Sequence, residues 1–243
     1  MTPDNVRSSR VGLDLVRWGA DRLRVGAWRG NALIAYIAPL ADGAPPTVDA
    51  VRRCCEVLGG RGFREVITAA LGPAESRGFI EAGFQVRERL HLLAHDLLDM
   101  PASPPVSLRR GRRIDRTSAL DVDARSFDTF WQLDDGGFDE AIAATPSSRF
   151  RIADVDQRVV GYAVSGRAGP RGFLQRLAVD PEHQGRGFGR ALAIDGLRWM
   201  KRRGVDRAMV NTQERNDAAL ALYQRLGFRL QPGGLAVLQT ILT

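Results

Sequence analysis

The feature that most constrains this chain is a glycine-rich basic loop between an apolar segment and an amphipathic segment. The apolar segment Leu177–Val179 ends at Asp180-Pro181, and glycines at positions 185, 187 and 189 then alternate with arginine and phenylalanine. Glycine lacks a Cβ, so its backbone can turn successive N–H groups toward one point. A helix that begins near residue 188 would add unpaired N–H groups and the positive end of its dipole. The segment therefore predicts a strand, an anion-binding loop suited to a phosphate or pyrophosphate, and a helix, in that order.

Two well-known glycine loops do not fit this segment. A Walker loop requires Lys and Ser or Thr after its last glycine, and the dinucleotide fingerprint requires Gly-x-Gly-x-x-Gly with an acidic residue about twenty positions on. The chain instead reads Gln184-x-x-Gly187-x-Gly189 after Leu-Ala-Val-x-Pro, which resembles the signature of the GNAT superfamily of N-acetyltransferases. The alternative is an ordinary glycine-rich turn before a surface helix, and the flanking residues 177–181 and 191–192 argue against it.

A second motif lies further along the chain, where Asn216-x-x-Ala-x-x-Leu222-Tyr223 closes on Gly227-Phe228. Asn216 is a good N-cap for the helix that follows, and Gly227 is a natural residue to end that helix. The block is similar to the later GNAT motif. Taken alone, Tyr223 would be interpreted as a core aromatic residue, but its position in this motif, after the glycine loop, favours a catalytic role.

The resemblance implies both a fold and a site. The fold is α/β, a GNAT acyl-CoA N-acyltransferase fold with a central mixed twisted sheet flanked by helices. In that family the loop binds the pyrophosphate of acetyl-CoA, the strand before the loop separates from its neighbour to pair with the pantetheine arm, and a tyrosine protonates the departing sulfur. Carried over, the catalytic residue is Tyr223, and the cofactor-binding residues are Leu177, Ala178, Val179, Gln184, Gly185, Arg186, Gly187, Phe188, Gly189, Arg190 and Asn216.

The resemblance leaves parts of the chemistry open. A strand N–H near Ala178 or Val179 could polarise the thioester oxygen, and no metal is expected. Acetyltransferases of ribosomal-protein N-termini usually carry Glu where this chain has Asn211, and histone-type members carry Glu near the position of Phe173. No inherited general base is therefore visible. Glu214 and Asp180 are within reach, although we favour their interpretation as exposed loop carboxylates, and a relay of water to bulk is a further route.

The acceptor site is expected along residues 127–140, which hold four aromatic and five acidic side chains. Two interpretations of this segment stay open. In one, the aromatic residues pack the acceptor and the carboxylates attract a cation; in the other, Phe127, Phe130 and Trp131 are core contacts and the acids are helix caps.

The order of predicted elements divides the chain at a proline-rich segment. Residues 106–243 fit one GNAT N-acetyltransferase domain, residues 101–105 read as a linker, and residues 1–100 read as a degenerate GNAT-like domain, a truncated first copy in tandem. In that first copy, residues 38–46 stand where the phosphate loop should be. They lack the glycine pattern and contain prolines, which offer no N–H donors.

Composition narrows the class of protein. The net charge is +7, carried almost wholly by arginines spread along the chain with a single lysine, Lys201, which argues against a dedicated nucleic-acid face. The neighbouring Cys54 and Cys55, the start without an apolar stretch and the lack of any membrane-spanning run favour a cytoplasmic protein with reduced thiols. The leading hypothesis is an enzyme that takes acetyl-CoA as acetyl donor and a primary amine as acceptor, either a protein or a small molecule. A non-catalytic acyl-CoA sensor or scaffold is the alternative.

Overall fold

The computed structural model describes residues 14–18, 21–40 and 43–242. The chain divides into two compact units, each assembled from separate segments. The first unit comprises Met1–His91, Gln213–Arg215 and Pro232–Thr243, and the second comprises Leu92–Thr212 and Asn216–Gln231. These boundaries differ from the expected segments 1–100 and 106–243, since the last strand of the chain belongs to the first unit and residues 92–105 belong to the second.

Within the described residues, the first unit is built on six strands and two helices. Their order in the sheet is β1 (Asp14–Trp18), β2 (Asp21–Trp28), β3 (Asn31–Pro39), β4 (Glu65–Thr68), β12 (Leu235–Ile241) and β5 (Gln85–His95), of which β5 is shared with the second unit. The helices are α1 (Val48–Gly60) and α2 (Pro73–Glu81). Fully buried side chains such as Ile37, Val51 and Phe79 form its core. The core also holds Cys54, and burial raises the pKa of Cys54 to about 12 and that of its neighbour Cys55 to about 11, so both remain thiols at neutral pH.

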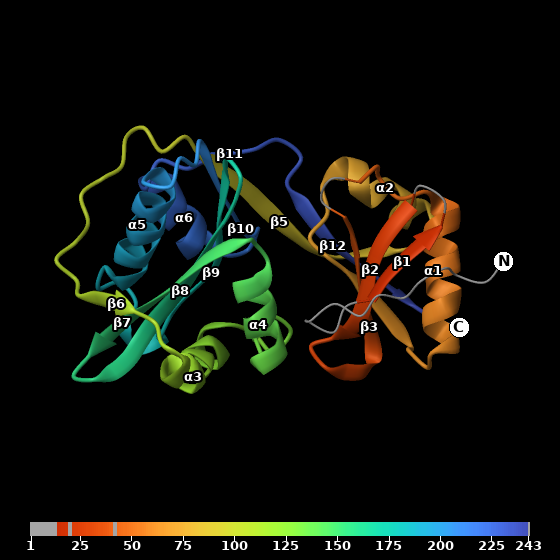
Figure 1. The fold of residues 1–243 in the computed structure, drawn as a ribbon, viewed down its shortest axis with the longest axis horizontal. Coiled ribbons are helices and arrows are strands. Elements are labelled where there is room, and N and C mark those ends of the chain that lie inside the picture. Colours follow the sequence, from red (N-terminus) through yellow and green to blue (C-terminus); the bar gives the residue numbers. More distant parts are fainter. Residues whose placement is uncertain (1–13, 19–20, 41–42, 243) are drawn as a thin grey trace. The chain divides into compact units, whose positions relative to one another are not determined.

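The second unit carries the glycine loop. From the end of β5, its sheet runs through β10 (Arg207–Gln213), β9 (Arg171–Val179), β8 (Arg158–Ala168), β7 (Ser147–Val155) and β6 (Leu108–Arg110), and β11 (Arg229–Leu230) pairs with β5. Its helices are α3 (Arg116–Ser126), α4 (Asp135–Ala143), α5 (Phe188–Lys201) and α6 (Asp217–Arg225), with short 3₁₀ turns at Arg113–Asp115 and Pro181–His183. Figure 1 shows α5 beside the strands β8 and β9, which it contacts.

Neighbouring residues along the strands of the second unit pack against two different layers of helices. Tyr162 and Ala178 pack with α3 and α4, whereas the next residues along their strands, Ala163 and Val179, pack with Leu192 of α5. Successive strand residues point to opposite faces of a sheet, so α3 and α4 cover one face and α5 the other. A mixed sheet flanked by helices confirms the predicted fold class.

The sequence predicts a strand over 106–113 and a helix over 118–130. The structure has only the short strand Leu108–Arg110, because the chain turns into the 3₁₀ turn at Arg113–Asp115, and the helix α3 ends at Ser126. Residues 41 and 42 of the segment 38–46, and Leu13, where a further strand is predicted to begin, lie outside the described residues.

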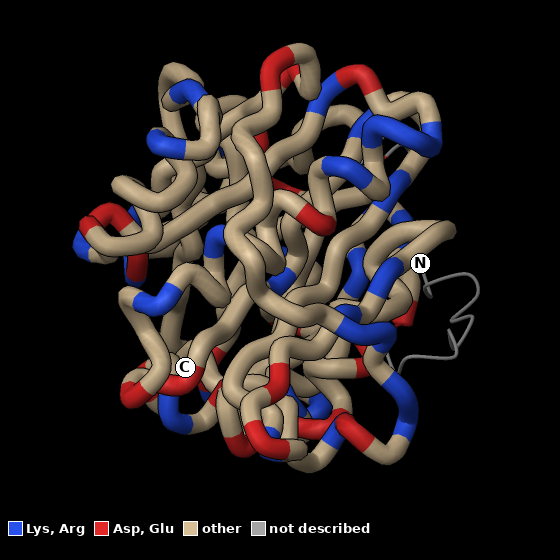
Figure 2. The backbone as a smooth tube through the Cα atoms, turned by 90° about the vertical axis from the view of Figure 1, so that its left-hand side faces the viewer, with Lys and Arg blue, Asp and Glu red and all other residues tan. Residues whose placement is uncertain are grey.

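Basic and acidic positions are intermingled over the face that Figure 2 shows, in keeping with the spread of arginine along the sequence. Within the described residues, none of the helices combines the length and the apolar character needed to cross a membrane.

Candidate functional site

The glycine loop presents an uncapped helix N-terminus to solvent. Gly185 and Gly187 have φ angles of 75° and 89°, in the left-handed region that favours glycine. Gly187 is the N-cap of α5, and no side chain accepts a hydrogen bond from the first N–H groups of that helix. The first turn of α5 holds no acidic residue. Free N–H groups, the helix dipole and a first turn without acids together suit an anion.

Side chains and a distant segment fix the two ends of this loop. The Gln184 side-chain amide donates to the backbone oxygen of Val179 at 3.0 Å, which ties the loop to the end of β9. Arg190 donates to the backbone oxygen of Ala102 at 3.3 Å, and Pro104 lies 3.5 Å from the position of a Cβ on Gly187. The expected linker, 101–105, therefore lies against the loop, while a Cβ on Gly185 would meet nothing within 4 Å.

The strand that leads into the loop loses its neighbour. Strands β9 and β10 are parallel, and their pairing covers only Arg171–Phe173 against Arg207–Met209. Strand β9 continues to Val179 and keeps its antiparallel partner β8 on the other edge, where Ala178 lies opposite Tyr162. The edge of β9 that faces β10 is therefore without ladder bonds from Leu174 onward.

Alternation along β9 shows which N–H groups point to that unpaired edge. Asp180 donates its backbone N–H to Val160 at the end of β8. Since backbone groups of successive strand residues point to opposite edges, Ala178 also faces β8, and Leu177 and Val179 face β10. Of the two oxyanion donors considered from the sequence, Val179 is the one whose N–H points away from β8.

Tyr223 lies on α6 in the same core as α5, with 6% of its surface exposed. Burial raises the pKa of Tyr223 to about 12, and the positive charge of Arg176 acts in the opposite direction. No hydrogen bond of its hydroxyl is seen within the described residues. At neutral pH, Tyr223 is therefore a neutral phenol with a hydrogen to donate. Asn216, the N-cap of α6, accepts a hydrogen bond from the backbone of Ala219 at 3.0 Å.

A buried ion pair that sequence reasoning missed supports β9 from the α3 side. Asp123 is fully buried and accepts two hydrogen bonds of 2.7 Å from Arg176 and one of 2.5 Å from the hydroxyl of Tyr162. Arg176 also donates to the backbone oxygen of Trp131 at 2.7 Å, and its guanidinium carbon lies 3.5 Å from the centre of the Phe127 ring. An arginine within the apolar run 173–179 was the available signal, because a buried charge requires a partner. The sequence did not reveal which carboxylate that partner is.

The structure divides the segment expected to form the acceptor site. Asp134 caps α4 by accepting from Gly137, which agrees with the interpretation of the acids as helix caps. Asp135 and Asp139 instead pair with Arg116, and Phe138 is buried in the core. Phe130 and Trp131 are only half-buried, with ring centres 5.0 Å apart.

The carboxylates considered as a general base are differently placed. Asp180 is buried, and its carboxylate accepts from Arg125 at 2.9 Å and from the backbone of Glu182 at 3.1 Å. Burial alone would raise the pKa of Asp180, but these bonds outweigh it and hold the pKa below its ordinary value. The sequence interpretation of Asp180 as an exposed loop carboxylate was therefore wrong, because the carboxylate is engaged at the end of β9. Glu214 is exposed, and Asn211 and Phe173 supply no carboxylate.

Comparison with known proteins shows what the glycine loop and the segments around it are similar to. A model of the acetyltransferase (GNAT) family matches residues 117–228. The chain is 32% identical over 190 residues to the mycothiol acetyltransferase of Thermobispora bispora, an alignment that covers 70% of this chain and 63% of that protein. It is also 32% identical over 184 residues to the mycothiol acetyltransferase of Saccharomonospora viridis, covering 63% of this chain and 60% of that protein. The chain thus spans less than two thirds of the length of these relatives.

Solved structures extend the similarity in fold to both units. A tandem GNAT protein from the clavulanic acid biosynthesis pathway aligns with 100% of this chain and 85% of its own, with a TM-score of 0.69 and 16% identity. A GCN5-related N-acetyltransferase from Sphaerobacter thermophilus aligns with 95% of this chain and 81% of its own, with a TM-score of 0.63 and 16% identity. At this level of identity the likeness concerns the fold.

Proposed function

Residues 117–228 belong to the acetyltransferase (GNAT) family, and from this membership we propose that the chain transfers the acetyl group of acetyl-CoA to a primary amine. One observation carries the proposal. The backbone pairing between β9 and β10 ends at Phe173 and Met209, directly ahead of an uncapped helix N-terminus with two left-handed glycines. A long, thin ligand with a diphosphate at one end fits both features at once.

The donor is proposed to lie along the unpaired edge of β9. The diphosphate contacts the N–H groups of residues 185–189, with Arg186 and Arg190 supplying positive charge, and the Ala102 bond of Arg190 is exchanged for a phosphate oxygen. Leu177 pairs with the pantetheine amides through backbone groups that have no ladder partner on that side. Val179 contributes its N–H to the thioester end of the donor, because its backbone oxygen already accepts from Gln184 and Ser126. Asn216 stays the N-cap of α6, and its remaining capacity for hydrogen bonds is used by the donor's arm.

In the proposed reaction, a neutral amine attacks the thioester carbonyl and forms a tetrahedral intermediate. The Val179 N–H donates a hydrogen bond to the oxygen that becomes negatively charged. When the carbon–sulfur bond breaks, the Tyr223 hydroxyl gives its proton to the departing sulfur, and the phenolate regains a proton from water. The products are the acetylated amine and the thiol of coenzyme A.

The proton of the attacking amine requires a separate route. The two carboxylates considered are an engaged Asp180 and an exposed Glu214, so we propose release to water. This route favours an acceptor with an appreciable neutral fraction at pH 7 to 8, such as an α-amino group with a pKa near 8, over a lysine with a pKa of about 10.4.

The experiment has two arms. Calorimetric titration of acetyl-CoA tests binding, and release of free thiol from acetyl-CoA across a panel of amines tests turnover. The panel contains compounds of mycothiol metabolism, suggested by the names of the relatives, together with peptide N-termini, lysine peptides and aminoglycosides. Tight binding without thiol release for any amine would support a non-catalytic acyl-CoA sensor instead, and no binding would overturn both functions.

Tyr223→Phe tests the proposed acid. Removing one hydroxyl leaves the packing of the ring in place, so the affinity for acetyl-CoA and the KM should stay within about twofold. The value of kcat should fall about 100-fold, which is within the usual range for loss of a positioned acid. A variant with unchanged kcat would remove Tyr223 from the reaction while leaving the donor site intact.

A further inference from the structure

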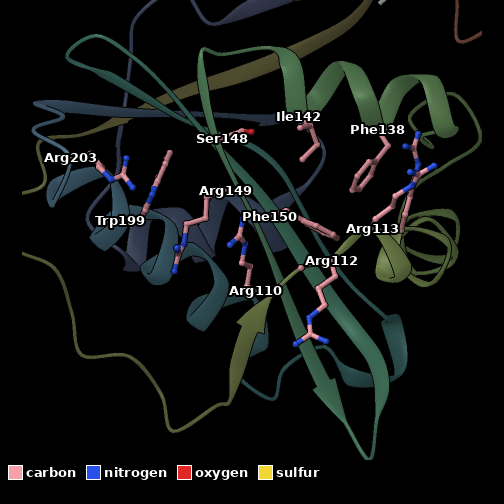
Figure 3. Close-up of a pocket in the computed structure, with 12 residues that line it drawn as sticks. Arg110, Arg112, Arg113, Phe138, Ile142, Ser148, Arg149, Phe150, Trp199 and Arg203 are labelled. Atoms are coloured by element: carbon pink, nitrogen blue, oxygen red, sulfur yellow. The ribbon is translucent and has the colours of Figure 1, made fainter.

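A pocket of the second unit lies at the edge of its sheet. Its volume is about 530 Å³, and its lining comes from the turn after β6, from α4, from the start of β7 and from the end of α5. Figure 3 shows Ser148 and Arg149 of β7 between the end of α5, with Trp199 and Arg203, and the α4 side, with Phe138 and Ile142. Strand β6 pairs with β7 only at Arg151–Ala153, so the start of β7 is left open to this pocket.

All charged residues of the lining are arginines, namely Arg110, Arg112, Arg113, Arg116, Arg149 and Arg203. Two of the six have carboxylate partners: Arg116 pairs with Asp135 and Asp139, and Arg149 with Asp195. In the part of the chain that the structure describes, the other four make no ion pair. Four guanidinium groups without an ion-pair partner among the described residues create a local positive potential around one hollow.

The aromatic residues of the pocket are already occupied. Phe138 and Trp199 are each 5% exposed. The guanidinium carbon of Arg116 lies 5.3 Å from the ring centre of Phe138, and that of Arg203 lies 5.8 Å from the ring centre of Trp199. Phe150, the third aromatic residue of the lining, packs edge-to-face against Phe138 and Tyr162. The three rings offer little open face to a planar base, so recognition in this pocket depends on charge and hydrogen bonds.

The pocket is separate from the proposed acetyl-CoA site. The glycine loop is at the N-terminus of α5, whereas Trp199 and Arg203 lie at its C-terminal end. A helix of 14 residues spans about 21 Å. A ligand in the pocket therefore would not touch the loop.

We propose that this pocket binds a compact, multiply phosphorylated small molecule. The planar guanidinium group presents paired N–H donors that match phosphate oxygens, and several such groups can neutralise several charges at once. The exposed Ser148 hydroxyl adds a neutral donor to the lining. A hollow of about 530 Å³ suits a small ligand, and the covered rings and the lack of a continuous basic stripe disfavour a nucleic-acid strand.

The test uses inorganic tripolyphosphate as the probe, titrated calorimetrically into the full chain at 150 mM NaCl with coenzyme A present in excess to fill the first site. We expect one tripolyphosphate per chain. The double variant Arg110→Glu/Arg203→Glu should weaken binding at least tenfold. Arg202→Glu, which reverses one charge beside Arg203 but outside the lining, should stay within twofold of the wild type.

Three results would overturn the proposal: no binding of tripolyphosphate to the wild type, equal losses for the double variant and Arg202→Glu, or tighter binding of a single-stranded oligonucleotide with the same arginine dependence. Titration of acetyl-CoA into the double variant shows whether the fold survives the substitutions. If it does not, Arg110→Gln/Arg203→Gln replaces it, with the same expected tenfold loss.

Discussion

Helices α1 and α5 each follow a strand of their own unit, and their N-termini differ in a way that decides ligand binding. At α1, the Thr47 side chain accepts from the backbone of Ala50 at 3.3 Å, two prolines precede the cap, and Asp49 lies in the first turn. At α5, Gly187 offers no side-chain cap, and the first turn has no acid. The first N-terminus is closed and repels anions, and the second is open to them.

The strands ahead of these helices show the same contrast. Strand β3 stays paired with β4 from Ile34–Glu65 to Ile37–Thr68, and the backbone N–H of Ala69 continues the contact to Ile37. Strand β9 stops pairing with β10 at Phe173 and runs on to Val179. The first unit satisfies its own backbone at the point where the second leaves donors and acceptors free. The site proposed for acetyl-CoA therefore depends on backbone N–H and C=O groups that the second unit does not pair within itself.

The largest expected effect comes from closing the open helix. Gly187→Glu places a Cβ at φ 89° and a negative charge at the anion site, so binding of acetyl-CoA should become undetectable by calorimetry. The matched control is Gly204→Glu just beyond the other end of α5, where φ is 70° and no atom lies within 4 Å of the added Cβ. Both variants carry similar backbone strain and the same charge, so equal loss of binding in the two would contradict the role of the loop.

The second prediction concerns how the open strand is held in place. Because β9 lacks ladder bonds on one edge, its Arg176–Asp123 pair carries more of the anchoring than the paired strands of the first unit require. Asp123→Asn leaves a buried guanidinium without its carboxylate and should lower the free energy of unfolding by about 3 kcal/mol. Urea denaturation measures the change, with the exposed Asp121→Asn on the same helix as control. A loss of less than about 1 kcal/mol would show that backbone contacts alone hold β9.

The glycine loop and the elements on either side of it could be predicted from the sequence for a physical reason. Glycines at 185 and 187, a proline at 181 and an N-cap asparagine at 216 act through local backbone geometry, so their effects are visible in short stretches of sequence. The strand, loop and helix over 171–201 accordingly lie within a few residues of their predicted positions. The closed helix of the first unit was predictable for the same reason, since prolines and Thr47 also act locally.

Contacts between distant residues were not predictable in this way. The assignment of β12 to the first unit depends on its pairing with Glu65–Ile67 and Gln85–Leu90, far away in the sequence. The Arg176–Asp123 pair joins residues 53 positions apart, and the arginine pocket joins residues 110–116 to Arg203. No local rule selects these partners, because each depends on the sheet order that brings the segments together.

A third prediction examines the residue at which the open strand becomes the loop. The lowered pKa of Asp180 means that its ionised form is favoured in the folded state. Its contribution to stability is present above the unfolded pKa of about 3.9 and is lost as pH falls through the lower folded value. Asp180→Asn should therefore cost about 1 to 2 kcal/mol at pH 7. The difference in free energy of unfolding between Asp180→Asn and the wild type should shrink below pH 4. The variant Asp206→Asn, at an exposed position, should not differ from the wild type at either pH. A difference that stays constant from pH 7 to pH 3.5 would show that the charge of Asp180 is not what holds Arg125 and the turn.

The smallest expected effect comes from removing the cap of the closed helix. Thr47→Ala loses the bond to Ala50 and the bond from the Thr47 hydroxyl to Asp21 at 2.9 Å, so the free energy of unfolding should fall by about 1 kcal/mol. Thr117→Ala, in the first turn of α3 where the threonine hydroxyl makes no bond within the described residues, should show no such loss. The stoichiometry of acetyl-CoA should stay at one per chain in both variants, because β3 and β4 remain paired and Asp49 remains in the first turn of α1. A second binding event in Thr47→Ala would mean that a single side chain separates the closed unit from the open one, and that strand pairing contributes little to the difference between them.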